Sequence, residues 1–359
     1  MKVKNKVVKI VIFILCATCF ATEMNLKNKI ELKNISNCQI QEENQNELYD
    51  FQIIDGIPVI FGEISFNNSA QSYKVVFIIE TGTAFSWLYA NEENKINIVE
   101  EFKFYNSKMP QQLFSLCSIN FKSSTNLSSF CVNDLYIRLS ESSASLNQKM
   151  KDLDCDFVGI LGNDVLTQKS LFFSFTKQKF GWPLSIEKPK ANNTETYFMN
   201  NIQQTVLGQN FYWHTVYVDD EVFNSESYFL FQKWDKTGSR YWIGTGIYSI
   251  CTAPFDFAEQ VDKHNYKGTI IEGATPLEKY GEITIPEISF FGKKFKNIKA
   301  TATKETNEIY VLKSIKLLGA QVLSAFDIYF DKNNSDRVKQ IYFYPVENKE
   351  YEDFRRKFD

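Results

Sequence analysis

The sequence predicts a mainly β protein whose two halves repeat each other. Three observations lead to this prediction: aromatic residues are abundant, apolar runs have the length of strands, and two motifs recur. Of the 359 residues, 15% are aromatic, including 32 Phe and 18 Tyr, and both types favour strands. Apolar stretches such as YKVVFII, VNDLYIRLS and KQIYFYPV are short and are separated by Asn, Gly and Ser, which is typical of strands.

The recurring motifs indicate an internal duplication. The segment LGNDVLTQKSLFF at 161–173 matches LGAQVLSAFDIYF at 318–330, with Leu-Gly, Val-Leu and two aromatic residues at the same spacing. Upstream, Thr81-Gly82 follows the apolar run VVFIIE, and Thr245-Gly246 follows YWIG. Because four elements occur in the same order, the sequence predicts two similar lobes.

These motifs and the composition between them divide the chain. The stretch WPLSIEKPKANNTET is polar and contains two prolines, which favours a linker between the lobes. In order, we expect a signal peptide at 1–22, a loose polar leader or propeptide remnant at 23–47, a first β lobe at 48–182, a linker at 183–200 and a second β lobe at 201–359.

The N-terminus has the pattern of a signal peptide. The basic start MKVKNK precedes the short apolar stretch VVKIVIFILCATCFA, which ends in small residues, so we expect cleavage near Ala21 or Thr22. An uncleaved membrane anchor is the alternative, but the apolar core is shorter than the roughly 20 residues of a spanning helix. We expect no stable membrane span after signal removal, and a protein that is secreted or lies in the lumen of the secretory pathway or vacuole.

Charge and residue types argue against several classes of function. The net charge is −3, from 40 basic and 43 acidic residues, which argues against nucleic-acid binding. The most basic stretch, GKKFKNIKATATK at 292–304, alternates Lys with Phe and Ile, and we interpret it as a half-exposed strand rather than a polyanion site. Cysteine spacing does not fit zinc, and His214 and His264 lie in no nucleophile motif. We expect no metal and no cofactor, and a monomer.

Cysteines and glycosylation sequons fit the secretory pathway. Removal of the signal takes Cys16 and Cys19, and the remaining number is odd, so at least one thiol is left over or pairs between chains. The remaining residues are Cys38, Cys117, Cys131, Cys155 and Cys251. Sequons, which such a compartment would glycosylate, lie at Asn34, Asn67, Asn126, Asn192 and Asn333.

Several segments follow one another in a recognisable order. The motif ETGTAFSWL is followed by SINFKSSTNLSSFCVNDLYI and DFVGILGNDVL, and later by YWIGTGIYSICTAP and LLGAQVLSAFDIYF. From about Asp55 to Val346 this order resembles the pepsin-like aspartic peptidases, with the two Thr-Gly motifs in place of their Asp-Thr-Gly loops. The resemblance implies two pseudo-twofold-related β lobes, a cleft between them and a flap at SINFKSSTNLSSFCVNDLYI.

The resemblance also implies a catalytic pair, and both positions depart from it. In the family two Asp carboxylates share one proton, so that one activates water while the other protonates the scissile carbonyl. Here the two positions hold Glu80 and Gly244. We expect an inactive homologue that binds a peptide or protein in or around the cleft, with Glu80 accepting backbone N–H bonds. The alternative is an active or weakly active endopeptidase that takes a second carboxylate from Asp235 or Asp256.

The Thr and Gly residues that follow the two catalytic positions match the family. In the family, the Thr of each loop hydrogen-bonds across the lobe interface, which implies this role for Thr81 and Thr245. Gly82 and Gly246 permit the tight backbone. Tyr248 follows the second loop, and it either fills the space of the missing acid or faces outward.

The flap segment departs from the family as well. Phe121 stands where the family has Tyr, which keeps the ring and loses the hydroxyl. Cys117 and Cys131 flank this hairpin on opposite arms, and a disulfide between them would pin it. Unpaired thiols, or pairing with Cys38 or Cys155, are the alternatives, because geometry decides.

Overall fold

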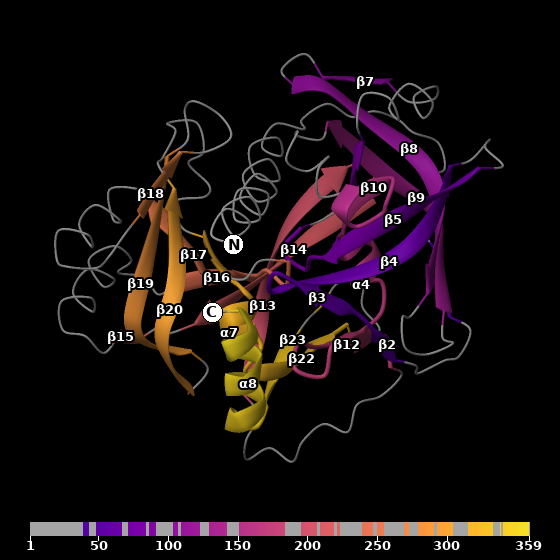
Figure 1. Ribbon diagram of the computed structural model, residues 1–359. Coiled ribbons are helices and arrows are strands. Elements are labelled where there is room, and N and C mark those ends of the chain that lie inside the picture. Colours follow the sequence, from indigo (N-terminus) through magenta and orange to yellow (C-terminus); the bar gives the residue numbers. More distant parts are fainter. Residues whose placement is uncertain are drawn as a thin grey trace.

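Strands predominate in the part of the chain that the structure describes (Figure 1). The structure is a computed structural model, and it describes residues 39–42, 48–66, 71–83, 86–90, 103–106, 109–122, 129–141, 151–183, 195–206, 209–218, 221–222, 239–246, 250–254, 269–272, 279–290, 293–303, 315–332, 338 and 340–358.

Nine strands form the first sheet. They are β1 (Gln39–Glu42), β3 (Gln52–Ile54), β4 (Ile57–Phe66), β5 (Ser72–Ile79), β6 (Trp87–Ala90), β7 (Lys103–Asn106), β8 (Met109–Lys122), β9 (Ser129–Glu141) and β10 (Phe157–Leu161). Their order is β1-β9-β6-β10-β5-β4-β8-β7, and β3 pairs with β4. This sheet comes entirely from the first half of the chain.

Fourteen strands form the second sheet. They are β2 (Leu48–Asp50), β11 (Leu171–Ser174), β12 (Lys179–Gly181), β13 (Glu195–Val206), β14 (Gln209–Val218), β15 (Glu221–Val222), β16 (Ser239–Ile243), β17 (Ile250–Pro254), β18 (Thr269–Glu272), β19 (Lys279–Phe290), β20 (Lys293–Thr303), β21 (Ile315–Leu318), β22 (Phe326–Asp331) and β23 (Gln340–Pro345). Their order is β15-β19-β20-β17-β21-β16-β14-β13-β23-β22-β11-β12-β2, and β18 pairs with β19. The mainly β fold expected from the sequence is confirmed.

The two halves repeat one pairing pattern. β10 lies parallel to β5 and antiparallel to β6, while β6 lies parallel to β9. In the second half, β21 lies parallel to β16 and antiparallel to β17, while β17 lies parallel to β20. The short helices α4 (Asn163–Leu166) and α7 (Ala320–Leu323) follow β10 and β21, and their N-cap glycines have φ of −100° and −99°. The internal repeat is therefore confirmed in the strand pairing.

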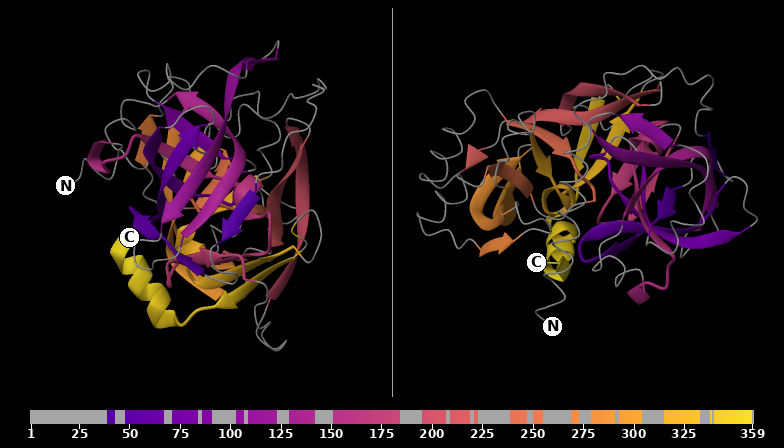
Figure 2. Two further views of the ribbon diagram at one scale, coloured as in Figure 1. Left: turned by 90° about the vertical axis from the view of Figure 1, so that its right-hand side faces the viewer. Right: turned by 90° about the horizontal axis from the view of Figure 1, so that it is seen from above.

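Antiparallel strands from both halves form a layer between the lobes. β2, β12 and β11 from the first half continue into β22, β23 and β13 from the second. In Figure 1, the strands of the first sheet lie on one side of this layer, and β15, β18, β19 and β20 lie on the other. The view from above in Figure 2 shows the same two lobes.

Aromatic rings fill the core of the first lobe where it meets this layer. The Tyr49 and Phe130 ring centroids lie 4.6 Å apart, and those of Phe130 and Trp182 lie 5.2 Å apart. Trp182 Nε1 donates to the Leu166 carbonyl at 2.8 Å. Tilted and edge-on ring pairs add to the free energy gained by burying apolar area. The high Phe and Tyr content thus holds β2, β9 and the end of the first lobe together.

Two segments that we expected to be irregular contain strands. β1 lies inside the leader at 23–47 and pairs antiparallel with β9. Ile40 packs against the core, and Glu42 forms an ion pair with Lys169. β13 begins inside the segment 183–200 that we expected to be a linker. Ladder hydrogen bonds join main-chain groups, so the polar composition of these segments did not reveal their pairing.

The C-terminal helix α8 (Asn348–Phe358) contacts both halves of the chain. Its buried side chains are Tyr351 and Phe354. Tyr351 packs edge-on against Phe295 with 5.7 Å between ring centroids, and Phe354 packs against Phe175 at 5.9 Å. None of the helices in the described ranges is long and apolar enough to cross a membrane.

Candidate functional site

The two Thr-Gly loops begin with the same backbone contact. The N–H of Glu80 donates to the carbonyl of Leu161 at 3.0 Å, and the N–H of Gly244 donates to the carbonyl of Leu318 at 3.0 Å. Leu161 and Leu318 are the first residues of the repeated Leu-Gly segments. The parallel pairs β5–β10 and β16–β21 therefore place both loops at equivalent points of their lobes.

Thr81 and Thr245 connect the two loops. The N–H of Thr81 donates to Thr245 Oγ1 at 3.0 Å, and Thr245 Oγ1 donates to the carbonyl of Ile79 at 2.7 Å. In the other direction, Thr81 Oγ1 donates to the carbonyl of Ile243 at 2.6 Å. Both threonines are fully buried, so these bonds form without competition from water. The sequence-predicted pair thus lies together at the lobe interface.

Glu80 lies in the same place, and its carboxylate accepts hydrogen bonds from both loops. Oε1 accepts the N–H of Gly82 at 2.5 Å, and Oε2 accepts the N–H of Gly246 at 3.0 Å. The residue is 8% exposed. Glu is one methylene longer than Asp, and position 244 carries no side chain. One carboxylate therefore reaches across the interface and accepts hydrogen bonds from backbone N–H groups of both loops.

The glycines of both loops make room for this carboxylate. A Cβ on Gly82 would lie 2.7 Å from Glu80 Oε1, and a Cβ on Gly246 would lie 2.7 Å from both Glu80 Oε2 and the Ile78 side chain. Real Cβ atoms do not approach other atoms this closely, so any larger residue would push the carboxylate aside. Close approach therefore explains why both loops carry Gly at these positions.

Burial raises the pKa of Glu80 to about 7, and hydrogen bonds from the Gly82, Gly246 and Thr245 backbone partly offset this shift. Desolvation disfavours the charged form of a carboxyl group, while amide donors favour it. No carboxylate in the described part of the chain contributes to the shift. The charge-sharing pair of an aspartic peptidase is therefore not formed by the described residues.

A second layer of polar residues supports the first loop. Asn163 Nδ2 donates to the Thr81 carbonyl at 2.8 Å. The Asp164 carboxylate accepts the N–H and the hydroxyl of Ser86 at 2.8 and 2.7 Å, and burial raises its pKa to about 6. Ser86, Asn163 and Asp164 are not among the residues predicted from the sequence. The sequence position of two of them could have indicated their role, because Asn163 and Asp164 directly follow the repeated Leu-Gly.

Several sequence-predicted residues lie outside the described residues. They include the two alternative acids, Asp235 and Asp256, and the aromatic residue Tyr248. The sequon residues also lie there, namely Asn34, Asn67, Asn126, Asn192 and Asn333. Their predicted roles stay predictions.

Phe121, which we expected at a flap over the cleft, lies in the core of the first lobe. Its side chain is 0% exposed, and its ring stacks on Phe130 with 4.6 Å between centroids. Cys117, Ile119 and Phe121 alternate along β8 and all face inward, as the two-residue period of a strand requires. This placement corrects the expectation of a cleft residue.

The possible disulfide between Cys117 and Cys131 is not formed. Cys131 lies opposite Asn120 in the ladder, three positions along β8 from Cys117, and a strand rises about 3.3 Å per residue. Cys117 faces the core, whereas Cys131 is partly exposed. Their thiols donate instead to the Leu135 carbonyl at 3.4 Å and to Asn120 Oδ1 at 2.8 Å. Register and facing therefore separate two residues that the hairpin pattern appeared to bring together.

The cysteine geometry predicts the order of thiol labelling in the native protein. We expect iodoacetamide to modify Cys131 first, because its side chain is partly exposed. Cys155 should react slowly, since burial and two neighbouring Asp residues raise its pKa to about 11. Cys117 should react only after unfolding. Peptide mass spectrometry would check this order, and equal protection of Cys117 and Cys131 until reductant is added would contradict it.

Comparisons with known proteins give structural similarity without sequence similarity. No family model and no curated protein matches the sequence. The crystal structure of basic 7S globulin from soybean aligns over 86% of this chain and 95% of that chain, with a TM-score of 0.41 and 9% identity. A retropepsin-like aspartic protease from Rickettsia conorii aligns over 42% of this chain and 97% of that chain, with a TM-score of 0.25 and 18% identity. These similarities concern the arrangement of strands.

Proposed function

We propose that this chain is an inactive homologue of aspartic peptidases, which binds a peptide or protein segment in or around the space between its lobes. One observation supports this proposal most directly. Both oxygens of the Glu80 carboxylate accept backbone N–H groups, one from each loop, while Gly244 offers no second acid. We place the protein in the secretory pathway, as its N-terminal pattern predicts.

Peptide hydrolysis by this scaffold needs two acid–base groups at the same time. One group must take a proton from water while the other donates a proton to the carbonyl oxygen. Glu80 is either protonated or ionised at a given moment, so it can act as the acid or as the base but not as both. The threonine contacts that connect the loops do not depend on a second acid. The arrangement of the two loops that would bind a segment is therefore kept even though the acid pair needed for hydrolysis is lost.

The test measures binding and cleavage on the same peptides. The full secreted chain is incubated with a library of extended peptides that carry a photo-crosslinking residue, from pH 3 to 7. We expect a subset of peptides to crosslink beside the Thr-Gly loops and the β8–β9 hairpin, with no cleaved product. A pepsin-type enzyme on the same library is the positive control for cleavage. Crosslinks confined to other surfaces, or no crosslinks at all, would contradict the proposal.

A weakly active endopeptidase is the second candidate, and the raised pKa of Glu80 favours it. A carboxyl group with a pKa of about 7 is a stronger base once ionised than an ordinary carboxylate. This candidate predicts cleavage that rises towards neutral pH and is lost in Glu80→Gln. Cleavage that a statine-type inhibitor blocks, and that Glu80→Gln removes, would replace the binding proposal by this one.

A further inference from the structure

The leader strand β1 covers a short edge of the first sheet. β9 pairs with β8 along one of its sides, and on its other side it pairs first with β1 and then with β6. The ladder with β1 spans only residues 130–133 of β9, and no other described strand pairs with that side of this stretch. An uncovered strand edge presents main-chain N–H and C=O groups that can pair with another chain. Without β1, this stretch of β9 would therefore be open for pairing.

Two side chains of β1 face the inside of the lobe. Ile40 lies opposite Val132, and Glu42 lies opposite Phe130. Opposed residues of an antiparallel ladder point to the same side of the sheet, and here that side is the core, because Val132 and Phe130 are buried. Ile40 packs against the core, and the side chain of Glu42 is only 4% exposed. The edge of β9 therefore accepts an apolar side chain and, two residues later, a carboxylate.

Lys169 provides the positive charge for that carboxylate. It follows α4 in the chain, and its Nζ forms an ion pair with Glu42 Oε1. The Lys169 side chain is 48% exposed, so water also solvates its ammonium group. A carboxylate as buried as that of Glu42 would be strongly disfavoured without a cationic partner. Lys169 therefore favours an acid at this place of the site over a neutral or basic residue.

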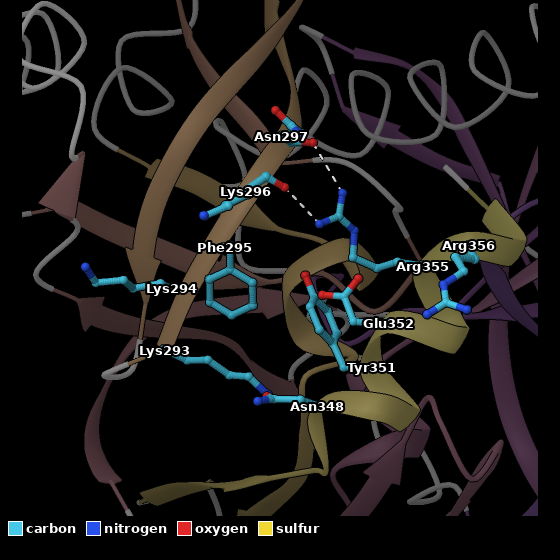
Figure 3. Close-up of a pocket in the computed structure, with 10 residues that line it drawn as sticks. All are labelled: Lys293, Lys294, Phe295, Lys296, Asn297, Asn348, Tyr351, Glu352, Arg355 and Arg356. Atoms are coloured by element: carbon cyan, nitrogen blue, oxygen red, sulfur yellow. Dashed lines mark hydrogen bonds between the residues drawn. The ribbon is translucent and has the colours of Figure 1, made fainter.

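β1 is held less firmly than the C-terminal helix α8. That helix buries Tyr351 and Phe354, and Arg355 donates hydrogen bonds to two carbonyls of β20 (Figure 3). In β1, two of the four residues are exposed and the other two are only partly buried. Glu42 Oε2 is buried without a hydrogen-bond partner among the described residues, which opposes docking. The strand therefore gains little free energy in this place, and a similar segment can replace it.

The β1–β9 ladder indicates which ligand this edge takes. The docked strand is antiparallel and four residues long, with an apolar side chain at its second position and a carboxylate at its fourth. When a strand adds to a sheet edge, main-chain hydrogen bonds give affinity and the places for alternate side chains give specificity. We propose that the 130–133 edge of β9 binds an extended segment of a partner protein with this pattern, and that β1 occupies the site in the free chain.

β1 can leave this edge while the layer between the lobes stays in place. Five residues, 43–47, separate β1 from β2, and β2 is held by its own ladder with β12. A strand on a short tether competes at an effective concentration of about millimolar, so a cut within 43–47 would favour the partner. This proposal goes beyond the function proposed above and does not depend on it, because the β1–β9 ladder includes no residue of the Thr-Gly loops.

The first experiment removes the tether after folding. In the full chain, residues 43–47 are replaced by the recognition sequence of a site-specific protease, and the folded protein is cut there and passed over a gel-filtration column. A fluorescent peptide with the leader sequence QIQEEN, residues 39–44, is then titrated by anisotropy. We expect saturable binding with a Kd at least about tenfold lower for the cut than for the uncut protein. Equal binding to both, or a leader fragment that excess peptide does not displace, would overturn the proposal.

The second experiment tests the pattern with two further peptides on the cut protein. The peptide IQQEEN has the same composition as the leader peptide, but its apolar residue is moved by one position and so faces the other side of the strand. We expect it not to bind. The peptide SVSEGS has an unrelated sequence with the same pattern, and we expect its Kd to lie within about tenfold of that of the leader peptide. If only the leader peptide binds, the edge serves the leader alone and the assignment of a partner is wrong.

The third experiment locates the site with two variants of equal charge in the cut protein. Lys169→Ala removes the ion-pair partner, and the control Lys349→Ala removes an exposed lysine of α8. We expect the Kd of the leader peptide to rise at least about fivefold in the first and to stay within about twofold in the control. Equal changes would show attraction by net charge alone and overturn the proposal. Circular dichroism follows the fold, and unfolding caused by the cut would show that β1 is an integral strand and would equally overturn it.

Discussion

Replacing Thr245 by Val should lower the free energy of unfolding by about 2–4 kcal/mol, because two buried main-chain groups lose their partner. The hydroxyl accepts the N–H of Thr81 and donates to the carbonyl of Ile79. Val has nearly the same shape and provides neither bond. Since the two groups belong to the first loop and Thr245 belongs to the second, the loss falls on the contact between the lobes. Denaturant unfolding monitored by Trp fluorescence measures it.

Two further variants separate the hydrogen bonds from the packing. Thr245→Ser keeps the hydroxyl and removes one methyl group, so we expect it to lose about 1 kcal/mol. Thr81→Val removes the bond to the Ile243 carbonyl, and we expect an intermediate loss of about 1–2 kcal/mol. If the Ser and Val variants at position 245 were equally unstable, the hydroxyl would contribute nothing and the bridge between the loops would be unimportant.

The positions of these loops could be predicted from the sequence because the pattern is local. An apolar strand that ends at Thr-Gly occurs twice, and each is followed by a Leu-Gly segment at a similar distance. In each half, the strand that ends at Thr-Gly then has few possible partners, and the strand that ends at Leu-Gly is one of them. The way Glu80 is held could be predicted only in part, because its bond to Gly246 depends on how the second lobe docks. No local pattern encodes that docking.

The possible Cys117–Cys131 disulfide is not formed, because a strand pattern shows which side of the chain is apolar and does not fix which residues pair across the hairpin. The hairpin pattern placed Cys117 and Cys131 on opposite arms, but the register moved them apart and onto opposite faces. The basic stretch at 292–304 was interpreted as a half-exposed strand, and this prediction is confirmed, because β20 buries Phe295 and Ile298 and exposes Lys294 and Lys296.

Folding stability should fall as the pH rises from about 4 to 8, by about 3 kcal/mol through Glu80 alone. The pKa of Glu80 is about 7 in the folded protein and 4.5 for an ordinary Glu. The folded state therefore binds this proton more tightly than the unfolded state does. Its contribution to stability is complete below pH 4.5 and is lost as the pH rises through 7. Urea unfolding at a series of pH values measures this slope.

Glu80→Gln identifies the residue responsible, since the amide does not ionise. We expect this variant to lose most of the slope between pH 5 and 7. Part of the slope at lower pH should remain, because Asp164 has a pKa of about 6 in place of 3.8 and acts with the same sign. Asp164→Asn should remove that part and keep the part due to Glu80. An unchanged slope in Glu80→Gln would mean that the carboxylate is already ionised at pH 5. The three backbone N–H groups would then offset its burial, so that folding would leave the pKa of Glu80 near that of an ordinary Glu.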